Sequence, residues 1–162
     1  MKIRETIEKQ LEEVKANRRS LHKIPEIGLN TVKTAAYLRA KGIEYGVDSI
    51  DDTLIENGLV MQIKAAVPTD KGIGLRSDID ALPMGEKTGV SFQSEHEGCM
   101  HACGHDGHMA MVLSLAQYVD REKELPCNVL CIFQPSEETT GGAKNICETG
   151  ILKKYNVTRI FG

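Results

Sequence analysis

The 162-residue sequence contains no long apolar segment. No stretch approaches the roughly 20 apolar residues that a membrane-spanning helix needs. The first residues are charged from Lys2 onward and lack the apolar core of a secretory signal. Five cysteines, an odd number without an export signal, are typical of reduced thiols rather than of a disulfide framework. These absences predict a cytoplasmic protein that does not enter a membrane.

The sequence also lacks any concentration of basic charge. Its net charge is −3, and no run of lysine or arginine offers the basic patch that binds phosphate backbones, so nucleic acid is not an expected partner. Internal repeats and low-complexity tracts are absent as well. Apolar residues make up 41% of the chain, which is enough for a packed core in one domain of ordinary size.

Local patterns predict strands that alternate with helices. Helices are expected over residues 3–22, from Asn30 or Thr31 to Gly42, from about His108 onward, and over 143–148. The helix near His108 is expected to use one apolar face, formed by Met111, Val112, Leu115 and Val119. Strands are expected at 58–65, 72–77, 128–133 and 157–161. This order predicts an α/β fold, a three-layer sandwich with a mixed, largely parallel sheet.

Acidic side chains follow two of the expected strands. Asp78 and Asp80 come after one strand, and Glu137 and Glu138 after another. In open α/β sheets the ligand crevice lies beyond the carboxyl ends of the strands, so these residues are expected at one site. Residues 79–107 show no periodicity, and a loop of that length in a compact domain is usually functional.

A cluster of cysteine and histidine lies in that loop. In extended backbone Cys103 and His105 point the same way, and thiolate with imidazole suits zinc or a similar metal. A structural zinc knuckle of Cys99, Cys103, His105 and His108 is an alternative that the cluster alone leaves open. The other cysteines are expected to be buried apolar residues: Cys127, Cys131 and Cys147.

The two acidic pairs favour a catalytic site over a structural one. Either pair alone is more typical of a turn, a helix cap or a solvated loop. If they converge, two like charges about 4 Å apart cost on the order of 4 kcal/mol at an effective dielectric near 20. Divalent cations would turn this repulsion into binding, whereas a structural zinc needs no spare carboxylates.

Four segments resemble, in order and spacing, the motifs of one known family. They are residues 18–28 (RRSLHKIPEIG), 75–83 (LRSDIDALP), 100–108 (MHACGHDGH) and 133–138 (FQPSEE). The chain is identified by them as similar to the metal-dependent aminoacylase/hippurate-hydrolase family of amidohydrolases, relatives of the dinuclear zinc carboxypeptidases. The resemblance implies hydrolysis of amide bonds in N-acyl amino acids or related small amides.

The resemblance also implies roles for individual residues. Cys103, His105 and Glu138 would bind divalent metal, two ions in a complete site, with zinc, manganese, cobalt or nickel as candidates. Glu137 would be the general base that takes a proton from a metal-activated water. The catalytic set would be completed by Asp78 and Asp80, which match an acidic motif that supports the metal site. Three more residues are expected to support the loop through hydrogen bonds, namely His101, Asp106 and His108. His22 matches the family without a derivable role.

Members of that family are usually more than twice this length. They carry an inserted, smaller domain for dimerisation and substrate binding, and further histidines later in the chain. Residues 1–162 are therefore expected to be the N-terminal part of the catalytic metal-binding domain, without the inserted domain and the C-terminal part. The alternative is a truncated, inactive fragment or a subunit that needs a partner chain. Apolar surface left exposed would favour a homo-oligomer.

Overall fold

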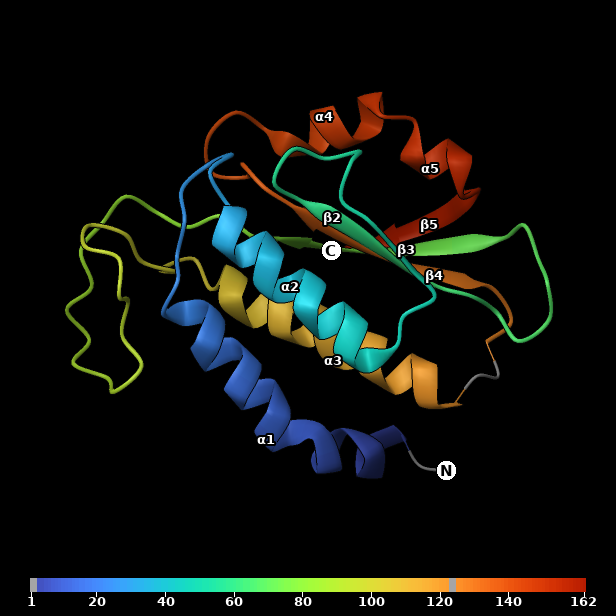
Figure 1. Cartoon of the computed structure of the whole chain (residues 1–162), viewed down its shortest axis with the longest axis horizontal. Helices are drawn as coiled ribbons and strands as arrows, with labels where there is room; N and C mark the ends of the chain where they lie inside the picture. The colour runs from blue at the N-terminus through green and yellow to red at the C-terminus, as the bar shows by residue number, and fades with distance from the viewer. Residues whose placement is uncertain (1–2, 123–124) are drawn as a thin grey trace.

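Helices cover both faces of a central sheet in the computed structural model, which describes residues 3–122 and 125–162 (Figure 1). One face carries α1 (Ile3–His22), α2 (Val32–Tyr45) and α3 (His105–Glu122). The other face carries α4 (Gly142–Glu148) and α5 (Ile151–Lys154). The predicted three-layer α/β sandwich is confirmed.

The sheet has five strands in the order β1-β2-β4-β3-β5. Their bounds are β1 (Ser49–Asp51), β2 (Leu59–Ile63), β3 (Gly72–Asp78), β4 (Asn128–Gln134) and β5 (Val157–Phe161). The strand β3 runs parallel to β4 and to β5, whereas β2 pairs antiparallel with β4 and with β1, so the sheet is mixed. Asp78 is paired with Gln134, so β3 and β4 end side by side at one edge.

Strand β4 and helix α3 form the centre of the core. The strand is buried from Val129 to Gln134 because it lies between β2 and β3 with helices on both faces. Helix α3 turns Met109, Leu113 and Ala116 toward the sheet, all fully buried.

The apolar face predicted for this helix is right only in part, because Val112 and Leu115 pack against the core but the fully buried side chains are at other positions. Met111 is 60% exposed, Val112 and Leu115 are only partly buried, and the side chain of Val119 lies outside the described residues. The helix also begins at His105, three residues earlier than expected. Because it is apolar on more than one side, periodicity alone could not identify the side that meets the sheet.

Helix α2 begins where predicted, after the N-cap residue Thr31, but it ends later than predicted. It continues past Gly42 to a left-handed glycine at Gly46. A Cβ atom at Gly42 would lie 2.9 Å from atoms of Ile50 and of Met61, so glycine here lets the helix approach the sheet. At its start, the carboxylate of Glu26 accepts the backbone N–H groups of Lys33 and Thr34, at 3.1 and 2.8 Å. This residue therefore caps the helix in place of the expected Asn30 or Thr31 side chain.

All five cysteines are free thiols, as predicted. Cys131 is fully buried, but Cys127 is only partly buried and Cys147 is exposed, so the predicted burial is wrong for Cys147. Its helix α4 lies on the outer face of the sheet, where only some positions reach the core. Separately, no helix in the described ranges has the length and apolarity needed to cross a membrane.

Candidate metal centre

The two acidic segments predicted to converge are joined by the carboxylate of Asp80. This side chain is fully buried just beyond β3. One of its oxygens accepts the backbone N–H of Glu137 at 3.0 Å, and the other accepts that of Glu138 at 3.1 Å. The loop after β4 is thereby fastened to the segment after β3 at the carboxyl edge of the sheet.

That loop has a tightly folded backbone. Ser136 is buried with φ at 62°, a left-handed conformation that costs free energy in a residue other than glycine. Its hydroxyl lies 2.6 Å from the hydroxyls of Thr139 and Thr140, and its carbonyl accepts the N–H of Gly142 at 2.9 Å. A strained backbone conformation that several hydrogen bonds maintain is typical of functional loops.

The ring of His105 is the point on which the carboxylates converge. Its Nδ1 lies 2.8 Å from the backbone carbonyl of Asp80, and because a carbonyl only accepts, Nδ1 donates. In the neutral ring, Nε2 then presents a lone pair. Oxygens of three carboxylates surround Nε2: Asp78 at 3.5 Å, Glu138 at 3.7 Å and Glu137 at 3.9 Å. Each separation is too long for a good hydrogen bond, yet ligands about 2.1 Å from one tetrahedral ion lie about 3.4 Å apart.

The three side chains predicted to bind metal are brought together. The ligand atoms of Cys103, His105 and Glu138 all lie within 4.8 Å of one another. Glu138 Oε1 is buried and has no hydrogen-bond partner among the described residues. A hydrogen bond to Glu138, desolvation and the neighbouring carboxylates raise the pKa of the exposed Cys103 thiol. Such unbalanced negative charge around thiol and imidazole suits a divalent cation. The roles of these residues as ligands stay predictions.

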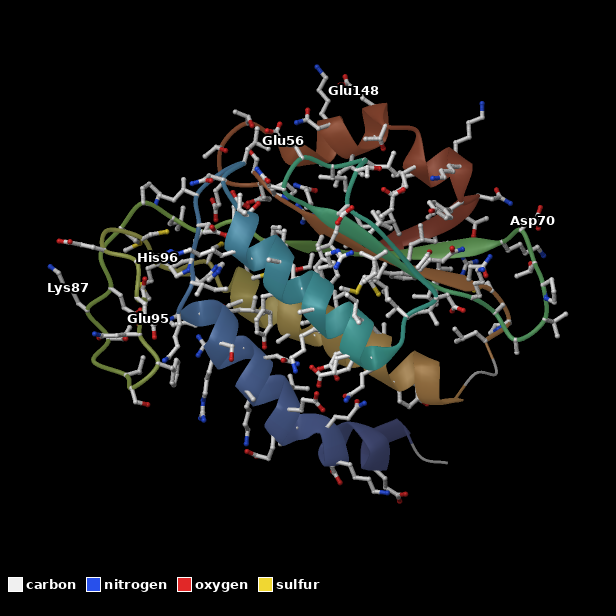
Figure 2. All side chains as sticks on the ribbon, in the orientation of Figure 1. Glu56, Asp70, Lys87, Glu95, His96 and Glu148 are labelled. Atoms are coloured by element: carbon white, nitrogen blue, oxygen red, sulfur yellow. The ribbon has the colours of Figure 1, made fainter. Side chains whose placement is uncertain are left out.

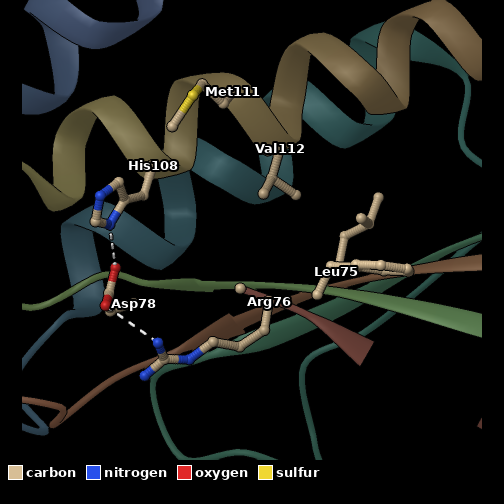
Figure 3. Close-up of a pocket in the computed structure, with 8 residues that line it drawn as sticks. Leu75, Arg76, Asp78, His108, Met111 and Val112 are labelled. Atoms are coloured by element: carbon tan, nitrogen blue, oxygen red, sulfur yellow. Dashed lines mark hydrogen bonds and ion pairs between the residues drawn. The ribbon is translucent and has the colours of Figure 1, made fainter. Parts of the chain in front are cut away.

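Asp78 is held between two cationic or donor groups. His108 Nδ1 lies 2.8 Å from one of its oxygens, and the Arg76 guanidinium donates to the other at 3.2 Å (Figure 3). Asp78, His105 and His108 form a second group with ligand atoms within 4.8 Å. Both groups depend on His105, whose single available nitrogen can bind only one ion. Within the described ranges, a second ion would therefore need a ligand other than His105.

A cavity of about 510 Å³ adjoins Asp78. In Figure 3, Met111 and Val112 on helix α3 lie across it from Leu75 and Arg76 on strand β3. Its lining is thus apolar along the helix and the strand, and charged at the end near the candidate metal centre. Such a cavity suits a small molecule with an apolar part and a polar reacting group.

The zinc-knuckle alternative is not assembled in the described part of the chain. Cys99 is buried and belongs to neither group of potential metal ligands. His101 is also buried, burial lowers its pKa to about 4, and neither ring nitrogen has a partner within residues 3–122 and 125–162. The supporting hydrogen bond predicted for His101 is therefore not found.

Sequence patterns alone assigned no role to Arg76, which lies beside the candidate metal centre, or to Glu86, which lies outside it. Arg76 lies in a quoted motif, and the structure shows it between Asp78 and Gln134. Glu86 lies in the long loop and contacts His22, which is 64 positions away. Alternation along β3 could have placed Arg76 beside Asp78, but no local signal connects positions so far apart as His22 and Glu86.

Comparison with known proteins agrees with this geometry. Residues 74–162 match the model of peptidase family M20/M25/M40. An N-acetyldiaminopimelate deacetylase of Priestia megaterium is 44% identical over 144 residues, which cover 89% of this chain and 38% of that protein. One from Listeria welshimeri is 41% identical over 152 residues, covering 94% of this chain and 40% of the relative. The chain thus spans about two fifths of the length of these relatives.

Solved structures show the same fold. The YXEP protein of Bacillus subtilis, described as a dinuclear metal-binding peptidase of the M20 family, has 36% identity and a TM-score of 0.87. The match covers 93% of this chain and 42% of that one. An aminobenzoyl-glutamate utilization protein of Klebsiella pneumoniae, at 18% identity and a TM-score of 0.78, agrees in fold. On the match over residues 74–162, the chain belongs to peptidase family M20/M25/M40, a family of metal-dependent hydrolases that includes amidohydrolases.

Proposed function

We propose that this chain carries part of the catalytic centre of a metal-dependent amidohydrolase that acts on N-acyl amino acids. The observation that carries the proposal is the convergence of three carboxylates on His105 Nε2, with a buried oxygen of Glu138 left without a partner in the described residues. Relatives named N-acetyldiaminopimelate deacetylases make acetylated diamino acids the first substrates to test.

Each residue of the site has a separate task in this proposal. Cys103, His105 and Glu138 hold a divalent cation, which supplies polarisation of the amide carbonyl and acidification of water. Glu137, whose side chain is 42% exposed, takes a proton from water and returns it to the leaving amine. Asp80 positions both glutamates through their backbone N–H groups.

Asp78 has a supporting task. Its two oxygens are engaged by Arg76 and by His108, and one of them lies 3.5 Å from His105 Nε2. This arrangement keeps a negative charge beside the imidazole without placing Asp78 in the group that contains the thiol. The negative charge of Asp78 attracts a cation bound at His105 Nε2, while the Asp80 carbonyl on Nδ1 fixes the orientation of the ring.

Metal binding is the first test. The protein is expected to bind Zn²⁺, Mn²⁺ or Co²⁺ in competition with a chelator. Glu138→Gln should weaken that binding by more than the roughly 10- to 100-fold typical of residues that only support a ligand. Glu148→Gln, at an exposed glutamate of α4, is the matched control and should bind like the unmodified chain (Figure 2). Equal affinity for all three proteins would contradict the proposed ligands.

A second candidate function is that of a subunit or part that needs more polypeptide to hydrolyse amides. It is favoured because both groups of candidate ligands in the described residues share His105, which can bind only one ion, whereas the YXEP protein is described as dinuclear. On this reading the 162-residue chain by itself shows no significant hydrolysis of an N-acyl amino acid panel with metals added. Metal-dependent hydrolysis by this chain, lost in Glu137→Gln, would exclude the second candidate and support the first.

A further inference from the structure

Outside the candidate metal centre, the buried ring of His22 at the end of α1 lies between two buried carboxylates. Its Nδ1 lies 2.7 Å from Asp106 Oδ2, and its Nε2 lies 3.2 Å from Glu86 Oε1. All three side chains are at most 3% exposed. Arg18, one turn earlier on α1, donates to the same Asp106 oxygen at 2.7 Å. These four residues, Arg18, His22, Glu86 and Asp106, are called the His22 cluster below.

Charge balance explains how the cluster can be buried. Ionised carboxylates only accept hydrogen bonds, so with both carboxylates ionised each ring nitrogen of His22 must carry a hydrogen. Two positive groups then face two negative groups. Without His22, Arg18 alone would face two buried carboxylates, and Glu86 would lose its contact with a cationic ring while keeping its neutral donors.

One side of the cluster leads to the candidate metal centre. Asp106 is the second residue of α3 and directly follows His105. Before the helix, Gly104 has φ at 88°, a conformation that favours glycine, and it separates Cys103 from His105. The Nδ1 of His105, opposite the nitrogen proposed to bind metal, donates to the backbone carbonyl of Asp80. Anchoring Asp106 therefore sets the first turn of α3 and the direction of both predicted ligands.

The other side of the cluster leads to the long loop. Glu86 accepts hydrogen bonds from the Thr88 hydroxyl and, at 2.6 Å, from the backbone N–H of Ser94. Phe92 from the same loop lies edge-on to the His22 ring and beneath the guanidinium groups of Arg18 and Arg19, about 5 Å from each. In Figure 1 this loop, coloured green to yellow, lies beside the end of α1 and the start of α3.

We propose that His22 is a positioning residue that joins the loop of residues 84–98 to the first turn of α3 and thereby orients Cys103 and His105 toward their cation. This inference rests on the proposed function for the identity of the ligands. It gives His22, the histidine of the N-terminal motif, a role that depends on two partners: Glu86, 64 positions later in the chain, and Asp106, 84 positions later.

The test measures metal affinity and local backbone opening in the same set of variants. His22→Phe is expected to weaken Zn²⁺ binding about 10- to 100-fold, the range typical when a partner that orients a ligand is removed. In the metal-free protein, amide hydrogen exchange of residues 103–108 should become faster, whereas exchange within β4 should not change. His96→Gln is the matched control, since His96 lies in the same loop and bonds the Pro25 carbonyl instead of the cluster (Figure 2).

A second substitution separates positioning from general stability. Glu86→Gln alone removes the partner of a charged His22 and should weaken metal binding. In the His22→Phe background the same change removes a buried negative charge that no longer faces a cationic ring, and it should restore part of the affinity. Glu86→Gln should therefore lower metal affinity in the unmodified chain and raise it in His22→Phe, and this reversal is expected only if the two residues act as a pair. Additive losses, or unchanged exchange at residues 103–108 in His22→Phe, would overturn the proposal. If the unmodified chain binds no ion, the proposed function fails, and the exchange measurement still decides the role of His22.

Discussion

Replacing Glu137 by glutamine is expected to lower amide hydrolysis by about 100-fold or more while leaving the metal content unchanged. The assay uses a polypeptide that spans the full length of the relatives. Glutamine has nearly the same shape as glutamate, but its amide cannot take a proton from water. Glu137 lies outside the Cys103–His105–Glu138 group, and its Oε2 is 3.9 Å from His105 Nε2, so the ligand set is retained.

The measurement pairs turnover of an N-acetyl amino acid with metal analysis of the purified variant. Glu138→Gln, at the neighbouring position, is the informative comparison because it should lose metal and activity together. The opposite pattern, with metal lost in Glu137→Gln and kept in Glu138→Gln, would show that the two glutamates have exchanged roles. Full activity in Glu137→Gln would remove it from the catalytic set.

Replacing Asp80 by asparagine is expected to lower the free energy of unfolding by about 3 kcal/mol. The Asp80 side chain is fully buried, and each of its oxygens accepts one backbone N–H, from Glu137 and from Glu138. Hydrogen bonds to a charged acceptor contribute roughly 1.5–3 kcal/mol each. Asparagine keeps one acceptor but turns an NH₂ group toward the other N–H, which leaves a buried donor unsatisfied.

Urea unfolding followed by circular dichroism measures this loss. Asp52→Asn is the matched control, because Asp52 is about half exposed and its ion pair with Arg39 lies on the surface, where such pairs contribute at most about 1 kcal/mol. A loss in Asp80→Asn no larger than that in the control would contradict the positioning task of Asp80. The metal affinity of Asp80→Asn should also fall, since Glu138 would lose its backbone anchor.

The two expectations concern different levels of the same site. Glu137→Gln tests chemistry at a side chain that is partly open to solvent, so the fold should tolerate it. Asp80→Asn tests the buried bond that holds the glutamate-bearing loop against the end of β3. If Glu137→Gln affects only the rate and Asp80→Asn mainly affects stability, the reacting group of the site is held in place by a separate, buried residue.

Short-range patterns in the sequence were sufficient for most of the helices and strands and for the ligand candidates. The range 157–161 coincides with β5, and the range 3–22 with α1, because hydrophobic periodicity is a local property. Glu137 and Glu138 could be paired from their place after a strand. Cys103 and His105 do lie together, but through the left-handed Gly104 and the start of α3 rather than through the extended backbone that was expected. The elements β1 and α5 were not predicted, since three or four residues are too few to show a period.

Only the tertiary structure decided which partners these residues meet. Segments distant in the chain determine which face of α3 is buried and allow α2 to continue beyond Gly42. They also supply the two backbone N–H groups that donate to the Asp80 carboxylate. The same holds for His22, whose partners lie 64 and 84 positions away. Packing selects one face of a helix that is apolar on several sides, and burial makes polar groups find partners wherever the fold brings them. Local sequence therefore determined which groups can react, and long-range packing determined how they are held.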